Sequence, residues 1–259
     1  MKENPNGLSQ NGLLDGRVAL VTGAAAGLGR KILQRLADSG ATGIAFDIAE
    51  SPKNLPRGWL ARRGDVSSES DLAETIEVIR QEYGRLDIVI ANAGLVPPWR
   101  DTEDIDFAEW ENVFAVNVKG VAATIKHAVP LMKAGTGSIV AMGSLNSRRA
   151  HASQCLYSAS KHAVLGIVRA AALDLGRYGI RVNALGPGPI ATDALVERIS
   201  KRSIDGGPSV AEALEQLASE AALGRIATAE DVANAALFLA SDLSAGITGQ
   251  LLPVDAGLA

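Results

Sequence analysis

Short apolar, β-branched runs alternate with longer amphipathic stretches along nearly the whole chain. This alternation predicts βαβ units and therefore a parallel sheet. The short runs are mostly apolar rather than alternating, as expected for strands that are covered on both faces. The expected strands are Val18–Thr22, Gly43–Phe46, Trp59–Arg62, Ile88–Ala91, Ser138–Met142, Arg181–Leu185 and Leu251–Val254.

The longer stretches repeat apolar residues at three- and four-residue steps, which predicts amphipathic helices. Ser68 and Thr228 each precede an acid by three positions, a pattern typical of a helix N-cap with an acid in the first turn. We find no internal repeat, low-complexity block or linker, so we expect one α/β domain over residues 16–259. The expected helices are Gly29–Ser39, Asp71–Tyr83, Phe107–Asn117, Gly120–Met132, Ser158–Tyr178 and Glu230–Ser241.

Two segments depart from this rhythm. Residues 1–15 contain Asn, Gly, Gln and Ser but no apolar block, which predicts a flexible tail and not a signal peptide. Residues 188–225 begin within Pro-Gly-Pro, contain Gly-Gly-Pro, and carry charged helical pieces on either side. A segment of this kind after a strand end is a candidate lid over a substrate site.

Composition narrows the functional classes. The chain has 259 residues, 47% hydrophobic and 21% charged, the ordinary balance of a soluble globule. The net charge of −4 argues against a nucleic-acid partner or an anionic membrane surface, and no apolar run approaches the roughly 18 residues of a membrane span. The single cysteine, Cys155, excludes an intramolecular disulfide and favours a reducing compartment, so we expect a cytoplasmic protein.

A glycine-rich turn directly follows the first expected strand. Residues 22–29 read Thr-Gly-Ala-Ala-Ala-Gly-Leu-Gly and lead into the next expected helix. Glycines there permit a tight turn and let the backbone approach a diphosphate, while the free N–H groups of the helix start favour negative charge. The turn is a candidate dinucleotide site, although an ordinary glycine-rich turn has the same residues. The spacing of Gly23, Gly27 and Gly29 differs from the commoner G-x-G-x-x-G pattern.

Asp47 ends the second expected strand, eighteen residues after Gly29. An acid at about this distance from the glycines can accept hydrogen bonds from the ribose hydroxyls of NAD, and it would repel the extra phosphate of NADP. The alternative is an aspartate that only stabilises its own turn, and the strand-end position favours the ribose role. Arg30 and Lys31 are the nearest basic residues and are expected on the helix surface, with Arg30 the one that can reach a phosphate.

Tyr157 and Lys161 are four residues apart, so on a helix they share a face. An ammonium beside a phenol favours the phenolate and lowers its pKa toward neutral pH, which suits a general acid or base. Among the three tyrosines, only Tyr157 has a lysine at the fourth place. Ser144 lies thirteen residues earlier, after an expected strand, where its hydroxyl can donate to a substrate oxygen. A serine that merely caps the strand end is the alternative.

Other residues near this constellation carry weaker signals. His151 and Cys155 are four apart, but two ligands do not make a zinc site, so we expect no metal and a packing role for the cysteine. Trp99, in a Pro-Pro-Trp segment, either lines a substrate pocket or belongs to a proline-stiffened surface loop. The sequence leaves open whether four further residues face the pocket: Arg148, Arg149, His151 and Gln154.

These motifs together resemble the short-chain dehydrogenase/reductase family, in its compact subfamily. The resemblance extends from Gly16 to the C-terminus. It implies a doubly wound Rossmann-type sheet of about seven parallel strands with helices on both faces. It also implies NAD-dependent hydride transfer between a secondary alcohol or its ketone and the cofactor. The motifs occur in order as the turn at 22–29, Asp65-Val66, Asn92-Ala93-Gly94, Asn117, Ser144, Tyr157 with Lys161, Asn183, and Pro187-Gly188 with Thr192.

The resemblance implies a catalytic role for four residues. Tyr157 would be the proton donor or acceptor, and Lys161 would lower its pKa and bind the nicotinamide ribose. Ser144 would hold the substrate oxygen. Asn117 would kink its helix and hold a water that links Lys161 to a proton relay.

The resemblance also implies which residues bind NAD. Asp65 would bind the adenine amino group, with Val66 packed near the ring. Asn92 and Gly94 would shape the strand end beneath the cofactor. The remaining residues implied in binding are Gly23, Gly27, Leu28, Gly29, Asp47, Tyr157, Lys161, Pro187, Gly188, Ile190 and Thr192.

Departures from the family pattern bear on the alternatives. NADP-preferring relatives commonly carry a basic residue where this chain has Ala26 and Ile48, which argues against an NADPH-dependent 3-oxoacyl thioester reductase. The complete set of four catalytic residues argues against a non-catalytic dinucleotide-sensing protein of the same fold. The expected partner is a small alcohol or ketone. Apolar stripes on residues 120–132 and 158–178 cover the sheet, and the resemblance adds pairing of these helices in a homotetramer.

Overall fold

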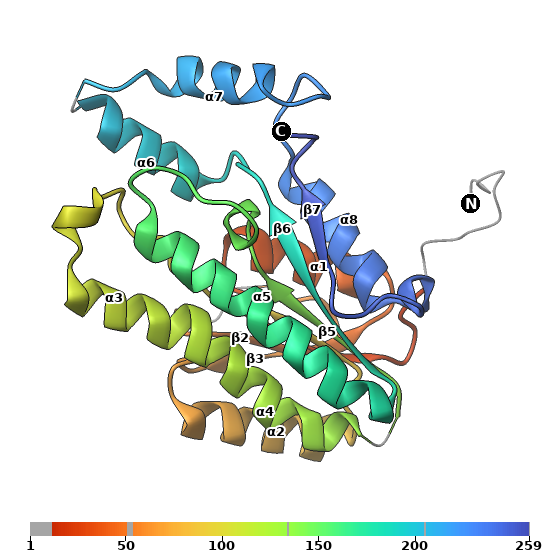
Figure 1. Ribbon diagram of the computed structural model, residues 1–259. Helices are drawn as coiled ribbons and strands as arrows, with labels where there is room; N and C mark the ends of the chain where they lie inside the picture. Colours follow the sequence, from red (N-terminus) through yellow and green to blue (C-terminus); the bar gives the residue numbers. More distant parts are fainter. Residues whose placement is uncertain (1–11, 51–53, 134, 205, 259) are drawn as a thin grey trace, which may run out of the picture.

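The computed structural model describes residues 12–50, 54–133, 135–204 and 206–258. Within them, seven strands form one sheet in the order β3-β2-β1-β4-β5-β6-β7, with every neighbouring pair parallel (Figure 1). This confirms the expected doubly wound α/β fold, and four strands are one to three residues longer than expected. The strands are β1 Val18–Thr22, β2 Thr42–Asp47, β3 Trp59–Arg63, β4 Ile88–Ala91, β5 Gly137–Met142, β6 Ile180–Pro187 and β7 Leu251–Val254.

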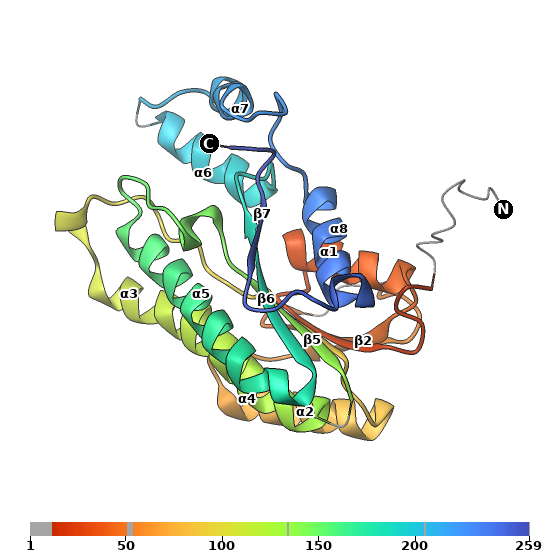
Figure 2. The same ribbon diagram turned by 45° about the vertical axis from the view of Figure 1, so that its right-hand side comes forward.

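Helices cover both faces of the sheet. On one face lie α1 (Gly27–Asp38) and α8 (Ala229–Ala240), whose buried side chains share a core cluster that includes Ile32 and Leu237. On the other face lie α2, α4 and α5, with Leu72, Val121 and Val164 in the second cluster. Figure 2 shows the two layers on either side of the strands. The bounds of these three helices are α2 Glu69–Tyr83, α4 Gly120–Met132 and α5 Cys155–Leu175.

The predicted N-caps Ser68 and Thr228 are confirmed, because each hydroxyl accepts the N–H of the acid three residues later, at 3.4 and 3.1 Å. Several helices nevertheless begin earlier than expected. α2 begins directly after its cap, and α1 begins two residues early, inside the glycine-rich turn. α5 begins at Cys155 rather than Ser158 and ends at Leu175, where a 3₁₀ turn follows. Tyr157 therefore lies in the first turn of α5.

The expected helices over 107–117 and 120–132 are one continuous helix. α3 (Phe107–Phe114) passes through a π-helical turn, Ala115–Lys119, directly into α4. A short π turn inside an α-helix is a frequent companion of functional sites, and Asn117 lies at its centre. The sequence predicted two separate helices because the spacing of apolar residues changes within this turn.

Part of the expected N-terminal tail belongs to the core. Leu14 is 1% exposed, it packs in the cluster beneath α1, and its N–H donates to the Ser39 carbonyl at 2.8 Å. The tail prediction was therefore wrong for residues 12–15, because the buried Leu14 side chain and its main-chain hydrogen bonds fix this segment against the domain. Residues 1–11 lie outside the described part of the chain.

The segment expected to form a lid contains two helices, α6 (Asp193–Ile204) and α7 (Val210–Ser219). Both lie beyond the carboxyl ends of the strands, apart from the layers that cover the sheet (Figures 1 and 2). A parallel bridge between Ile190 and Ala227 joins the two ends of the segment. The start of the segment and the chain just after its end thus lie side by side, as expected for a segment that moves as a lid.

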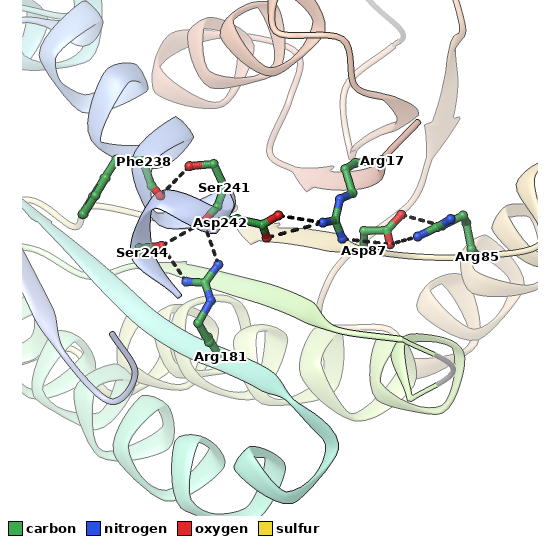
Figure 3. Close-up of polar contacts among 8 residues, drawn as sticks. All are labelled: Arg17, Arg85, Asp87, Arg181, Phe238, Ser241, Asp242 and Ser244. Carbon is green, nitrogen blue, oxygen red and sulfur yellow. Dashed lines mark hydrogen bonds and ion pairs between the residues drawn. The ribbon is translucent and has the colours of Figure 1, made fainter. Parts of the chain in front are cut away.

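A polar network closes the opposite, amino edge of the sheet (Figure 3). Arg17 lies between Asp87 and Asp242, with nitrogen–oxygen distances of 3.7 and 3.1 Å. Arg181 of β6 donates to the Leu239 carbonyl at 2.9 Å, near the end of α8. A cation is favourable there because the last carbonyls of a helix lack helical partners and carry partial negative charge. The network ties strands and α8 together on the side away from the site described below.

Candidate functional site

The glycine-rich turn leaves β1 at the carboxyl edge of the sheet, and close packing dictates two of its glycines. A Cβ on Gly29 would lie 2.0 Å from the Gly23 carbonyl oxygen, and one on Gly23 would lie 2.8 Å from Ala93. Gly27 has a φ of +54° and a Cβ there would meet open space. No side chain caps the start of α1 among the described residues. The turn therefore presents backbone N–H groups to an open surface, a suitable place for a phosphate group. Leu28 follows Gly27 in the first turn of α1.

Asp47 ends β2 beside this turn. Its carboxylate accepts the N–H of Ala25 at 2.8 Å and the N–H of Ala49 at 2.9 Å. The turn-stabilising role that we considered is therefore present. A carboxylate has about four acceptor positions, so the two remaining lone pairs leave room for ribose hydroxyls. The two roles are compatible at one side chain.

Arg63, a basic residue that the sequence pattern did not single out, lies beside the end of β2. Arg63 is the cross-strand partner of Asp47 in the register of β2 and β3, and its Nε donates to the Ile48 carbonyl at 3.1 Å. Arg30 is only partly exposed, with Nη2 on the Asn54 carbonyl at 2.8 Å. Linear spacing could not reveal Arg63, because its proximity comes from strand pairing.

The Thr22 and Asn92 side chains join the ends of β1 and β4. Asn92 donates from Nδ2 to the carbonyls of Thr22 and Gly23, both at 3.0 Å, and the Thr22 hydroxyl accepts the Asn92 N–H at 3.0 Å. Asn92 thus holds the turn in shape. A Cβ on Gly94 would lie 3.2 Å from the Asn117 side-chain oxygen and 3.6 Å from Lys161 Nζ, so glycine there permits a close approach.

The structure brings Tyr157, Lys161 and Ser144 together at the start of α5. Lys161 is 5% exposed, its Nζ donates to the Met142 carbonyl at 2.8 Å, and Nζ lies 5.7 Å from the centre of the Tyr157 ring. Ser144 is buried after β5, and its hydroxyl also accepts the Asn146 N–H at 3.2 Å. The serine therefore has the capping role as well as its place beside Tyr157.

Burial governs the proton affinities of this pair. Burial lowers the pKa of Lys161 to about 8. Burial also raises the pKa of Tyr157 above its ordinary value, while a hydrogen bond with Ser144 and the charge of Arg198 act in the opposite direction. The prediction that the pKa of Tyr157 falls below its ordinary value was thus wrong for the protein without a bound cofactor. Desolvation raises this pKa by more than Ser144 and Arg198 lower it. Arg198, on α6, is a contributor that sequence reasoning missed, since it is distant in the chain.

Asn117 lies fully buried in the π turn. Its Oδ1 accepts the Leu95 N–H at 2.7 Å, and its Nδ2 donates to the Leu95 carbonyl at 2.9 Å and to the Ser160 hydroxyl at 3.2 Å. The side chain therefore pairs with a main-chain amide in the loop after β4 and with α5 next to Lys161. Asn117 thus lies in a π turn at the place where the resemblance implies a kinked helix.

Other implied cofactor residues lie along the same edge. Asp65 follows β3 and accepts the Ser67 N–H at 2.8 Å, and Val66 packs against Gly120, where a Cβ would come within 2.8 Å. Pro187 ends β6, and the Gly188 N–H donates to the Val254 carbonyl at 3.1 Å. Ile190 is buried, and the Thr192 hydroxyl accepts the Leu195 N–H at 3.4 Å in α6.

Asn183 joins neighbouring chain segments below this edge. Its Nδ2 donates to the Ile247 carbonyl at 2.9 Å, and its Oδ1 accepts the Gln250 N–H at 3.0 Å. These two bonds connect β6 with the segment leading into β7, so the side chain has a structural role.

A hollow next to Tyr157 shows which of the two expected positions Trp99 has, a pocket wall or a surface loop. Residues 96–100 and 153–157 line it together with the start of α3. Trp99 and Gln154 both contribute to the lining, so Trp99 belongs to a pocket wall. Cys155 is exposed in the same hollow, which corrects the expected packing role. Arg148 turns toward the carboxylate of Asp255, at 3.6 Å.

Comparison with known proteins establishes the family. A model described as enoyl-(acyl carrier protein) reductase matches residues 23–259. The chain is 37% identical to short-chain dehydrogenase reductase 4 of Arabidopsis thaliana, over 97% of this chain and 85% of the relative. It is 36% identical to the cis-4-hydroxycyclohexanecarboxylate dehydrogenase of Sinomonas cyclohexanicum, over 93% and 96%. The chain belongs to the short-chain dehydrogenase/reductase family, a family of oxidoreductases that use nicotinamide cofactors.

The solved structures agree with this assignment. Carveol dehydrogenase from Mycobacterium avium, in complex with NAD, superposes with a TM-score of 0.87 and 34% identity, covering 95% of this chain and 99% of the other. No described helix has the length and apolar character needed to cross a membrane. In the same described residues, no three His, Cys, Asp or Glu side chains form a group that could hold a metal.

Proposed function

We propose that this protein is an NAD-dependent oxidoreductase that transfers a hydride between a secondary alcohol, or its ketone, and the nicotinamide. The observation that carries the proposal is the meeting of Tyr157, Ser144 and Lys161 beside a hollow at the carboxyl edge of the sheet. In open α/β sheets this edge is where ligands bind. When bound, NAD supplies the chemistry that the side chains lack, by accepting the hydride.

The residues present fit this cofactor. The open space at Gly27 and the uncapped start of α1 suit the diphosphate. Asp47 retains acceptor capacity that would serve the ribose hydroxyls, and Asp65 with Val66, which follow β3 farther along the same edge, would hold the adenine. The relation to an NAD complex of carveol dehydrogenase supports the choice of NAD.

The side chains then divide the proton chemistry. During oxidation, the Tyr157 oxygen takes the proton of the substrate hydroxyl as a general base, and in reduction it returns the proton. The Ser144 hydroxyl donates a hydrogen bond to the same substrate oxygen. Lys161 keeps a positive charge next to the Tyr157 ring at neutral pH, since its pKa is about 8. Asn117 fixes the loop at Leu95 and the start of α5, which keeps these groups in register.

The experiment that tests the proposal is a panel of secondary alcohols, sugars and cyclic diols with NAD, in which NADH formation is followed. Turnover with NAD supports it. A parallel assay with NADPH and 3-oxoacyl thioesters tests the alternative reductase. The description of the matching family, an enoyl-(acyl carrier protein) reductase, concerns a related thioester substrate, whereas Asp47 disfavours NADPH. Tight NAD binding without turnover across the panel would instead support the non-catalytic sensing protein.

The oligomeric state, the location and the lid complete the proposal. We propose a cytoplasmic homotetramer whose segment 188–225 closes over the substrate. Support comes from α4 and α5, which lie side by side on one face of the sheet, and from Leu173 on α5, whose side chain is 85% exposed. Light scattering tests the assembly, and a monomer at working concentration would contradict it.

A further inference from the structure

Gln154 lies in the wall of the hollow beside Tyr157. It is the N-cap residue of α5, and Tyr157 is the third residue of that helix. Side chains three positions apart along a helix lie on one side of it, with their Cβ atoms about 5–6 Å apart. A substrate whose hydroxyl binds at Tyr157 therefore places its neighbouring atoms close to Gln154.

The main chain of Gln154 is fixed from two directions. It forms a parallel bridge with Arg100 in the loop after β4, where the Arg100 N–H donates to the Ser153 carbonyl at 2.9 Å. The Gln154 carbonyl accepts the Ser158 N–H at 2.9 Å in the first turn of α5. The fold itself thus sets the position of this residue in the wall.

Asn146 sets the direction of the Gln154 amide. Asn146 is 4% exposed, and its Nδ2 donates to Gln154 Oε1 at 2.7 Å and to Ser158 Oγ at 3.1 Å. Both hydrogens of Nδ2 are thereby used, which fixes the Asn146 amide. Because Gln154 presents its oxygen to Asn146, its Nε2 group, which can only donate, is the end of the amide that remains for the hollow.

The charged side chains of the lining, and Ser153, are tied to protein neighbours. Arg100 pairs with Glu109 at 3.2 Å, and the Ser153 hydroxyl donates to Asp101 at 2.7 Å. Asp106 accepts two main-chain N–H groups at the start of α3. The rest of the lining is largely apolar, so a ligand meets one oriented N–H donor in surroundings that favour hydrocarbon. The apolar lining residues are Val96, Pro97, Pro98, Trp99, Ile105 and Leu156.

We propose that Gln154 determines substrate specificity by donating a hydrogen bond from Nε2 to a second oxygen of the substrate. The preferred substrates are small, mostly apolar secondary alcohols that carry a hydrogen-bond acceptor besides the reacting hydroxyl. This inference rests on the proposed function, because it assumes that the reacting hydroxyl binds at Tyr157. Asn146 is a positioning residue, since it acts through the amide of Gln154.

The test compares tetrahydropyran-3-ol and tetrahydropyran-4-ol with cyclohexanol. The two pyranols have nearly the shape of cyclohexanol, and their ring oxygen can accept a hydrogen bond but cannot donate one. With saturating NAD, we expect the wild-type protein to prefer at least one pyranol over cyclohexanol by about 3- to 10-fold in kcat/KM, the range of one net hydrogen bond. A wild-type protein that favours neither pyranol would overturn the inference.

Two substitutions remove the donor while keeping a polar contact between positions 146 and 154. Gln154→Glu keeps an oxygen for Asn146 but replaces Nε2 with a second oxygen, which repels the ring oxygen. Asn146→Asp offers an oxygen in place of N–H groups, so Gln154 turns its Nε2 toward position 146 and its own oxygen toward the hollow. Both variants should abolish or reverse the preference for the pyranol, mainly through KM. Because the added charge acts on Tyr157 with all three alcohols, the ratio isolates recognition of the second oxygen.

The matched control is Gln81→Glu, which adds the same charge on the exposed side of α2, where Gln81 Nε2 donates to Glu77 at 2.9 Å. It should keep the preference for the pyranol. A preference that survives in Gln154→Glu would overturn the role of Gln154, and one that survives in Asn146→Asp would overturn the role of Asn146.

A binding experiment separates this inference from the proposed function. An alcohol cannot react with protein saturated with NADH, so ligand-observed NMR titrations of the same three alcohols measure recognition without turnover. Tighter binding of a pyranol than of cyclohexanol to the wild-type protein, lost in Gln154→Glu, supports the inference, and equal or absent binding overturns it. Failure of every alcohol to react with NAD, with pyranol binding still dependent on Gln154, would count against the proposed function alone.

Discussion

Asp47 accepts the main-chain N–H of Ala25 at 2.8 Å, so the end of the second strand directly holds the glycine-rich turn. The residue expected to choose between NAD and NADP is thus also a structural part of the cofactor site. Changes at Asp47 should therefore alter cofactor choice and the order of the turn together.

We predict that the wild-type protein prefers NAD over NADP by about two orders of magnitude in kcat/KM, since charge-assisted hydrogen bonds are worth about 1.5–3 kcal/mol each. Asp47→Ala should lower kcat/KM with NAD by about 10- to 100-fold, and it should remove the charge repulsion that disfavours NADP. Steady-state kinetics with both cofactors measures this. Equal efficiency with both cofactors in the wild-type protein would show that Asp47 serves only the turn.

Arg63 provides the control for this prediction. Because its Cα lies opposite that of Asp47 in the register of β2 and β3, and its Nε donates to the Ile48 carbonyl, we expect Arg63 to soften the repulsion of NADP. Arg63→Ala should widen the preference for NAD, whereas Asp47→Asn, which keeps one side-chain oxygen, should retain more order in the turn than Asp47→Ala.

We predict that Tyr157→Phe loses about 10²- to 10⁴-fold in kcat while NAD binding stays nearly intact. The change removes only the hydroxyl, and the ring still packs at the start of α5. Turnover assays and a titration with NADH measure the two effects separately. Tyr178→Phe, at a site away from the hollow, should leave both unchanged. Activity near the wild-type value in Tyr157→Phe would refute the proposed mechanism.

Lys161 should give the stability of the ligand-free protein an unusual dependence on pH. Its pKa falls from 10.5 to about 8 on folding, so between these values the unfolded chain binds more protons than the folded one. Stability therefore rises with pH through this window, by at most about 3 kcal/mol. Urea unfolding from pH 7.5 to 10 measures the rise.

Lys161→Met is the matched comparison, since it keeps the aliphatic stem and removes the titrating group. As pH increases through this window, the wild-type protein should gain stability relative to Lys161→Met. The raised pKa of Tyr157 acts above pH 10 with the opposite sign and is present in both proteins. A difference that stays constant with pH would contradict the prediction.

Alanine substitutions at Gly27 and Gly29 should affect NAD binding and protein stability to different degrees. Gly29→Ala would force a Cβ to within 2.0 Å of the Gly23 carbonyl oxygen, so it should unfold the turn and lower the melting temperature markedly. Gly27→Ala meets open space and costs only about 1–2 kcal/mol of backbone strain at its positive φ. It should reduce NAD affinity more than stability. Thermal melts with and without NAD test the contrast.

The sheet and its helices could be predicted from the sequence because their apolar runs are long and their turns carry distinct residues. The helix starts at Ser68 and Thr228 followed from the local hydrogen-bonding chemistry of a cap. Leu14 could not be placed, since nothing in the sequence shows which apolar residue of a polar segment reaches the core. The π turn was missed because a single extra residue only interrupts the helical period.

The site shows the same division. The spacing of Tyr157 and Lys161 within one helix was enough to place them together. Arg198 and Arg63 were missed because they reach the site through a distant helix and a neighbouring strand. The raised pKa of Tyr157 was missed for a further reason, since the depth of burial belongs to the folded molecule and not to any motif.

The π turn at Ala115–Lys119 also fixes the rotational phase of the helix that follows it. An extra residue turns all later side chains by about 100° relative to those before it. Removing one residue from this turn would leave Asn117 or its neighbours in an ordinary helix, but it would also rotate Val121, Ile125 and Met132 away from the sheet. The chain therefore cannot lose the π turn at Asn117 without rotating the whole apolar face of α4 away from the sheet, so a one-residue deletion there would disrupt the core as well as the site.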